Sequence, residues 1–84
     1  GVNWEMNVRS TIKAFIESKL LSGREVSGEE NLLLSGLVDS LGVMRLVAFL
    51  EATFGFKVPA GDVKLSNFST LDDIVRYVGA RAEQ

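Results

Sequence analysis

The chain contains no cysteine and no histidine among its 84 residues, and only one proline. Without cysteine it forms no disulfide and no thiolate metal site, and without histidine it lacks the commonest metal ligand and general base. Carboxylates remain, but none occur at the spacing of a calcium loop. We therefore expect no bound metal and no catalytic activity, and any thiol that the protein uses must come from a cofactor.

Long apolar runs and an excess of basic charge are also missing. The longest apolar run, 46–50, is far shorter than the roughly 18 residues that cross a bilayer. Nine lysines and arginines are dispersed among eleven acidic residues, for a net charge of −2. The amino end shows no signal-peptide pattern. We expect a soluble, cytoplasmic, monomeric protein that binds neither nucleic acid nor membrane.

What the chain does contain is enough apolar material for one small core. Hydrophobic residues make up 46% of it, and 84 residues suit a single domain, 1–84. In the first segment Val8, Ile12 and Ile16 recur at the period of an amphipathic helix. We predict an all-α, small four-helix bundle with a long first loop and helices over about 4–21, 39–54, 59–64 and 70–80, of which the third is short.

The second helix has clear start and stop signals. Asp39 is a preferred N-cap residue and Gly55 stands where a helix would end. Between them Val43, Leu46 and Leu50 form one apolar stripe, which we interpret as core in preference to a tunnel for a ligand. The loop before this helix is glycine-bearing, but the leucines at 32–34 and 37 should pack and hold it in place.

Asp39-Ser40-Leu41, where this loop meets the helix, is the most informative feature of the chain. It places the Ser40 hydroxyl in the first turn of a helix, exposed and near the positive end of the helix dipole. An anion attached there would be stabilised by backbone N–H groups that have no helical partner. From Asp39-Ser40 alone, a simple helix cap with an incidental serine is the favoured interpretation.

A longer pattern surrounds this tripeptide. Residues 32–41 read Leu-x-x-Ser-Gly-Leu-Val-Asp-Ser-Leu, and the next helix ends in Phe-Leu-Glu-x-x-Phe-Gly. Val-Pro follows at 58–59, and Asn-Phe-x-Thr-Leu-x-x-Ile at 67–74. From about 31 to 78 the chain therefore resembles the acyl carrier protein family.

The resemblance implies a function and a cofactor. In this family a phosphopantetheinyl transferase moves phosphopantetheine from coenzyme A to a serine, which is Ser40 here, with Asp39 as the helix cap beside it. The thiol of the 4'-phosphopantetheine then holds an acyl or aminoacyl group as a thioester. A loading enzyme and a downstream synthase or transferase are the further partners that the resemblance implies.

In this family partners usually contact the second helix, which is often acidic. Here that helix has few acids, so electrostatic steering should be weak. We expect a more apolar docking face made of Leu41, Met44, Arg45, Ala48 and Glu51. These could equally be ordinary surface residues of a small helix.

Three functions stay open at this point. The favoured one is a carrier in a specialised bacterial pathway of the polyketide or nonribosomal peptide type. A housekeeping fatty-acid acyl carrier protein is the alternative within the family. An interaction adaptor whose serine is never modified is the alternative outside it.

Overall fold

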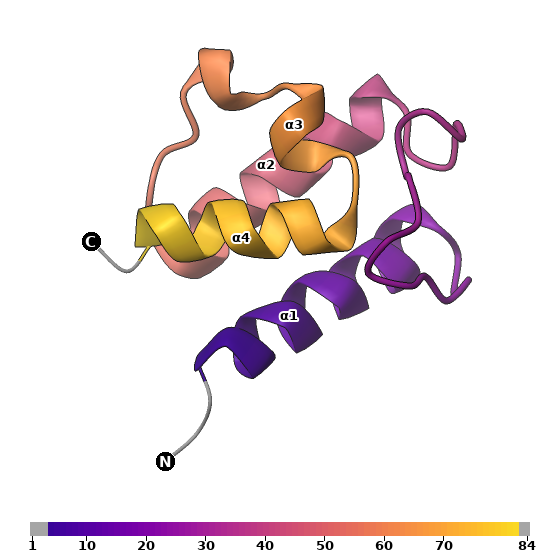
Figure 1. Cartoon of the computed structure of the whole chain (residues 1–84), viewed down its shortest axis with the longest axis horizontal. Helices are drawn as coiled ribbons and strands as arrows, with labels where there is room; N and C mark the ends of the chain where they lie inside the picture. The colour runs from indigo at the N-terminus through magenta and orange to yellow at the C-terminus, as the bar shows by residue number, and fades with distance from the viewer. Residues whose placement is uncertain (1–3, 83–84) are drawn as a thin grey trace.

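The computed structural model describes residues 4–82, which form a small bundle of helices with extents of 34 × 29 × 20 Å (Figure 1). The elements in order are α1 (Trp4–Phe15), the π-helical turn η1 (Ile16–Leu20), α2 (Ser40–Phe54), the 3₁₀ turn η2 (Ala60–Asp62), α3 (Leu65–Phe68) and α4 (Leu71–Ala82). No strand occurs within residues 4–82, so the all-α, four-helix prediction is confirmed. The ends of the predicted 1–84 domain lie outside the described residues.

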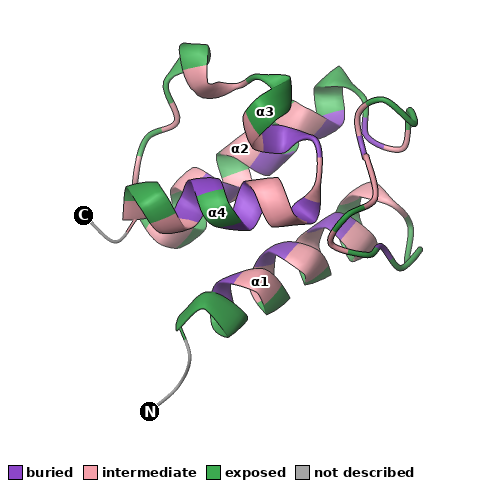
Figure 2. Ribbon diagram, viewed as in Figure 1, coloured by how far each residue is buried: buried purple, intermediate pink, exposed green. Residues whose placement is uncertain are grey.

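The core lies between α1, α2 and α4, whose inner sides carry the buried residues (Figure 2). Within residues 4–82, no helix has the length and apolarity needed to cross a membrane. The stripe predicted on α2 is largely core, because Leu46 and Leu50 are buried. Apolar side chains from α1 and α4 complete the interior: Val8, Ile12, Ile16, Leu71, Ile74, Val75 and Val78.

The first helix was predicted to end at about 21, and its last turn is wider than an α-helical turn. The N–H of Leu21 donates to the carbonyl of Ile16 at 3.0 Å, a bond across five residues that makes this last turn π-helical. Ser22 and Gly23 then take positive φ angles of 55° and 93°, which a right-handed helix does not allow. The helical segment therefore stops at Leu20.

The short third helix predicted at 59–64 is present only as a 3₁₀ turn, and the α-helical turn that follows it was not predicted. Residues 60–62 form only the 3₁₀ turn η2, and α3 spans Leu65–Phe68. The carbonyl of Lys64 accepts a bond from the N–H of Phe68 at 3.2 Å. Because Phe68 is only 2% exposed, the helix forms where this ring can enter the core, and glycine at position 61 disfavours a helix earlier.

The last helix begins as predicted and ends slightly later. The Thr70 hydroxyl oxygen accepts a bond from the N–H of Asp73 at 3.0 Å, which caps the start of α4. The helix continues to Ala82, beyond the predicted end at 80.

The long loop from 21 to 39 is held by burial and by backbone hydrogen bonds. Val26, Leu32 and Val38 are buried, whereas Leu34 is 76% exposed, so the leucines at 32–34 anchor the loop only in part. The N–H of Leu32 donates to the carbonyl of Ser69 at 2.7 Å. This bond ties the loop to the residues just before α4.

A second tie joins the same loop to the first turn of α4. The N–H of Asp72 donates to the carbonyl of Gly28 at 3.0 Å, and a Cβ at position 28 would lie 2.3 Å from Asp72 Oδ1. Glycine is therefore needed for this close approach. Arg9 Nη2 reaches the same carboxylate oxygen at 2.6 Å, but both side chains are half-exposed, so this ion pair contributes at most about 1 kcal/mol.

Tyr77 joins α4 to the segment between α2 and α3. Its hydroxyl donates to Asp62 Oδ2 at 2.6 Å, and its ring packs against Phe68 with centroids 5.4 Å apart. The pKa of the Tyr77 hydroxyl is raised to about 12, mainly because the hydroxyl is buried and secondly because it is hydrogen-bonded to the Asp62 carboxylate.

Replacing Leu50 with alanine tests the core. Leu50 is fully buried, so Leu50→Ala should lower the free energy of unfolding by about 2–5 kcal/mol, measured by urea denaturation. Leu34→Ala removes the same atoms from an exposed site and should change stability by less than about 0.5 kcal/mol. Equal effects of the two substitutions would show that Leu50 is not part of the core.

The Tyr77 environment is testable because this is the only tyrosine of the chain. In the folded protein, tyrosinate absorbance should appear with a midpoint near pH 12, against the ordinary value of 10.0. Since the folded pKa is the higher one, the stability from this hydroxyl is complete below pH 10 and is lost as the pH rises through 10 to 12. A midpoint near 10 in both the native and the urea-unfolded protein would contradict this environment.

Candidate functional site at the amino end of α2

The first turn of α2 is organised by Asp39. Its backbone is extended, with φ −93° and ψ −176°, and its Oδ1 accepts a bond from the N–H of Gly42 at 2.8 Å. The carbonyl of Asp39 accepts the first helical bond, from the N–H of Val43 at 2.9 Å. Asp39 is therefore the N-cap that the sequence predicted, and its carboxylate is engaged by the backbone.

Ser40 is the first residue of α2, and it is exposed. The N–H groups of Ser40 and Leu41 have no acceptor within residues 4–82, as expected for the first turn of a helix. Their partial positive charge favours an anion attached to the neighbouring hydroxyl. The structure therefore places an accessible nucleophilic oxygen where an attached phosphate is electrostatically favoured.

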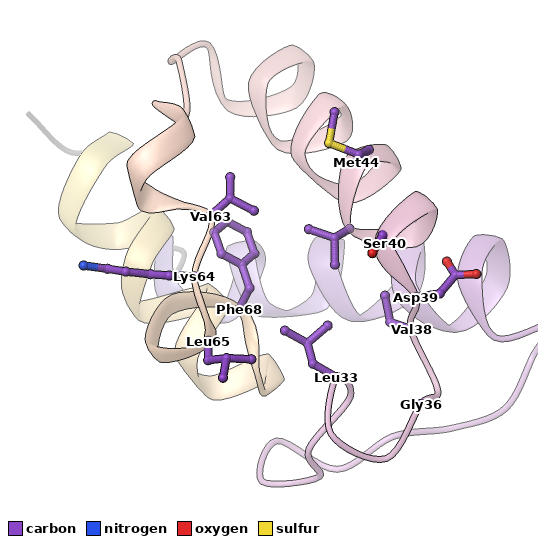
Figure 3. Close-up of a pocket in the computed structure, with 11 residues that line it drawn as sticks. Leu33, Gly36, Val38, Asp39, Ser40, Met44, Val63, Lys64, Leu65 and Phe68 are labelled. Atoms are coloured by element: carbon purple, nitrogen blue, oxygen red, sulfur yellow. The ribbon is translucent and has the colours of Figure 1, made fainter.

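Ser40 lies on the edge of an apolar depression between α2 and α3, which we call the wide groove (Figure 3). Its volume is about 600 Å³. The lining is mostly aliphatic, and its apolar residues include Leu33, Val38, Val43, Val63, Leu65 and Phe68. The sequence did not predict this groove. One wall of the groove is formed by residues 63–68, and the sequence did not predict the helix α3 in that segment. The Asn-Phe motif at 67–68 was the one sequence feature that could have pointed to this wall, because Phe68 lines the groove.

A narrower depression of about 220 Å³ lies on the other side of Asp39. Leu20, Gly42 and Arg45 are among its lining residues. Gly42 is buried, and a Cβ there would lie 2.9 Å from Val38 Cγ1 and 3.9 Å from Leu20 Cδ2. The absence of a side chain at Gly42 therefore lets the loop pack directly on α2.

The five residues predicted to form a docking face do not share one environment. Leu41, Met44, Arg45 and Ala48 are exposed on α2. Glu51 is half-buried, and its Oε2 accepts a bond from the N–H of Val58 at 2.8 Å. Glu51 therefore holds the segment that follows α2 in place, and one of its carboxylate oxygens already accepts a hydrogen bond.

The comparisons with known proteins agree with this arrangement. A family model described as the phosphopantetheine attachment site matches residues 10–78. Because that match spans most of the chain, the chain belongs to this family of carriers. It is 29% identical over 73 residues to the D-alanyl carrier protein of Streptococcus pyogenes serotype M5 (strain Manfredo), with 87% of this chain and 92% of the relative covered. The proteins of serotypes M49 (strain NZ131) and M1 match equally.

The family membership defines the chemistry. The protein is a phosphopantetheine carrier, with 4'-phosphopantetheine as its covalent cofactor, and it holds acyl or aminoacyl intermediates as thioesters. The reactive thiol belongs to the cofactor, so the protein needs only to attach, orient and present it. This agrees with a chain that has neither cysteine nor histidine.

The substitution Gly42→Ala tests whether the close packing of Val38 against position 42 contributes to the stability of the fold. Alanine improves helix propensity by about 1 kcal/mol, but here its methyl group would lie 2.9 Å from a buried valine. Overpacking of this kind costs about 1–3 kcal/mol. We expect a net loss of about 1 kcal/mol in the free energy of unfolding, measured in urea.

Gly61→Ala is the matched control, since a Cβ there meets no atom within 4 Å and its φ is not positive. That substitution should be neutral or slightly stabilising. If Gly42→Ala were as stable as Gly61→Ala, the contact with Val38 would not constrain the loop.

Proposed function

We propose that Ser40 carries the phosphopantetheine arm and that the cargo is a small aminoacyl group, used in a specialised biosynthetic pathway. The observation that supports the assignment most directly is the position of Ser40. It is the exposed first residue of a helix capped by Asp39 and lies at the edge of the wide groove.

The geometry suits a phosphodiester on the Ser40 oxygen. The neighbouring Asp39 carboxylate is negative, but its Oδ1 is held by the N–H of Gly42, whereas the N–H groups of Ser40 and Leu41 have no acceptor within residues 4–82. The start of the helix stabilises an attached anion by about 0.3–1 kcal/mol. Because Ser40 makes no side-chain hydrogen bond within residues 4–82, its hydroxyl can be modified without breaking a contact of the fold.

A small cargo is supported by the packing of the core and by the relatives. Leu46 and Leu50 of α2 are buried in the core, and Phe15 stacks on Phe49 with centroids 4.1 Å apart. The streptococcal relatives are D-alanyl carrier proteins by name, and an amino acid of that size needs no deep cavity. The apolar wide groove supports one alternative, a fatty-acyl chain lying along the surface between α2 and α3.

The proposed function implies partners but no catalytic group on this chain. A phosphopantetheinyl transferase installs the arm, a loading enzyme charges it, and a downstream synthase or transferase takes the cargo. We place these events in the cytoplasm, where coenzyme A is available, and infer that the carrier is a monomer. The exposed residues of α2 beside Ser40 are the proposed contact with these enzymes.

The attachment site is tested by incubating the protein with coenzyme A and a broad-specificity phosphopantetheinyl transferase, followed by intact-mass measurement. The native chain should gain the mass of one arm, and Ser40→Ala should gain none. Since Asp39 supplies the cap, helicity measured by circular dichroism should be unchanged in Ser40→Ala.

Ser66→Ala is the control, because Ser66 is also exposed and lies in α3 on the same domain. It should be modified as fast as the native chain. Modification of Ser40→Ala would place the arm on another residue, and failure to modify the native chain would favour an unmodified adaptor. The mass of the thioester isolated from the native host distinguishes an aminoacyl from a fatty-acyl cargo.

A further inference from the structure

The segment 59–67, which leads from the end of α2 into α3, contributes no buried side chain to the bundle. Each of its residues is exposed or half-buried, and its turn η2 contains no buried residue. The segment is fixed at both ends, because the N–H of Val58 donates to Glu51 Oε2 at 2.8 Å and Phe68 enters the core. A four-residue helix such as α3 is too short to be stable by itself. We call residues 59–67 the strap.

One carboxylate joins the strap to the opposite helix. Asp62 Oδ2 accepts the hydroxyl of Tyr77 at 2.6 Å and lies 3.1 Å from Nη1 of Arg81, and both partners belong to α4. In the described part of the chain, the other hydrogen bonds of the strap reach no further than residue 69. The carbonyl of Asp62 accepts two of them, from the N–H of Lys64 at 3.0 Å and from Nδ2 of Asn67 at 2.9 Å. Asp62 therefore connects the start of α3 to α4, and we call its contact with Tyr77 and Arg81 the Asp62 latch.

The strap also forms one wall of the wide groove. Val63 and Leu65 line the groove across from Ser40 (Figure 3). Val63 directly follows Asp62, so a movement of the strap away from α4 displaces this wall. The opposite wall belongs to α2 and to the loop before it, which are held by buried residues such as Val38 and Leu46. The shape of the groove can therefore change on one side only.

We propose that the Asp62 latch is a conformational device that holds the strap in one position and thereby sets the shape of the groove beside Ser40. The ionic part of the latch is weak, because the side chains of Asp62 and Arg81 are 26% and 42% exposed. A segment with few buried contacts opens more readily than the core. How much apolar surface a group attached to Ser40 meets then depends on the latch, and this consequence alone rests on the proposed function.

A contact that only stabilises the whole fold is the other interpretation of Asp62. The ring of Tyr77 is part of the core, since it packs against Phe56 and Phe68 with centroids 6.2 and 5.4 Å apart. Only its hydroxyl and the Arg81 guanidinium lose a partner when the latch opens. The two interpretations differ in extent, because release of the latch frees the strap alone, whereas loss of a general stabilising contact affects the strap and the core equally.

Amide hydrogen exchange of the unmodified chain, followed by NMR, separates these interpretations. In Asp62→Ala the amides of Val63, Lys64 and Asn67 should exchange about tenfold faster or more, because opening of the strap alone exposes them. The amides of Leu50 and Val78, which lie in the core, should accelerate by a much smaller factor.

Asp73→Ala is the matched control. The Asp73 side chain is 23% exposed and pairs with Arg76 of the same helix at 2.7 Å, so it resembles Asp62 but holds no part of the strap. Its loss should leave exchange of the strap amides within about twofold of the native rates. Tyr77→Phe keeps the ring and removes only the hydroxyl, so it should accelerate the strap amides even if Asp62→Ala fails to fold. Adding Tyr77→Phe to Asp62→Ala should change little, because the two substitutions remove the same hydrogen bond.

The position of the strap is measured with spin labels, which can be placed specifically because the chain has no cysteine. Labels on Ala48→Cys and Ser66→Cys, both at exposed positions, report the distance from α2 to α3. Pulsed electron paramagnetic resonance should give a narrow distance distribution with the latch intact and a broader one in Asp62→Ala. The distribution between labels on Ala48→Cys and Ser18→Cys, which joins α2 to η1, should not change.

Three outcomes would overturn the inference. Unchanged exchange of the strap amides would show that the latch does not hold the strap. Equal acceleration of strap and core amides would make Asp62 a general source of stability. Faster exchange with an unchanged α2–α3 distance distribution would show that the groove wall stays in place. Neither measurement uses the phosphopantetheine arm, so failure of Ser40 to accept the arm overturns the proposed function and leaves the latch standing.

Discussion

The contact of Val38 with Gly42 is the constraint on which the candidate site depends. At this point the long loop meets the helix that begins with Ser40, and a Cβ at Gly42 would lie only 2.9 Å from Val38 Cγ1. Leu20, from the last turn before the loop, approaches the same position. Because Asp39 follows Val38 directly, the burial of this valine also sets where the cap begins. One glycine therefore lets three segments converge beside the serine.

The loop is positioned mainly by burial and backbone hydrogen bonds, and surface charge contributes little. Leu32 is buried while its N–H donates to the carbonyl of Ser69, and the carbonyl of Gly28 accepts the N–H of Asp72. The ion pair of Arg9 with Asp72 is half-exposed and adds little to these ties. The Ser40 side chain is thus exposed while the backbone around it is held in place.

The net charge of the chain does not describe the surface around Ser40. Many carboxylates are engaged within the fold, for example Asp62 by Tyr77 and Arg81, and Glu51 by the N–H of Val58. Arg45 is the only charged residue between Ser40 and Leu50, and it forms no ion pair within residues 4–82.

The sequence by itself determined the features that arise from local interactions. Asp39 caps the turn that follows it, Gly55 ends α2 with a φ of 73°, and the spacing of apolar residues defines the buried sides of the helices. The motif around Ser40 was sufficient to indicate the family. Only the tertiary structure decided where α3 lies, why position 42 is glycine and that a groove opens beside Ser40. These features depend on contacts between separate segments of the chain, such as the Leu32 N–H with the Ser69 carbonyl and Leu20 with position 42, and no local pattern encodes how closely two segments will approach.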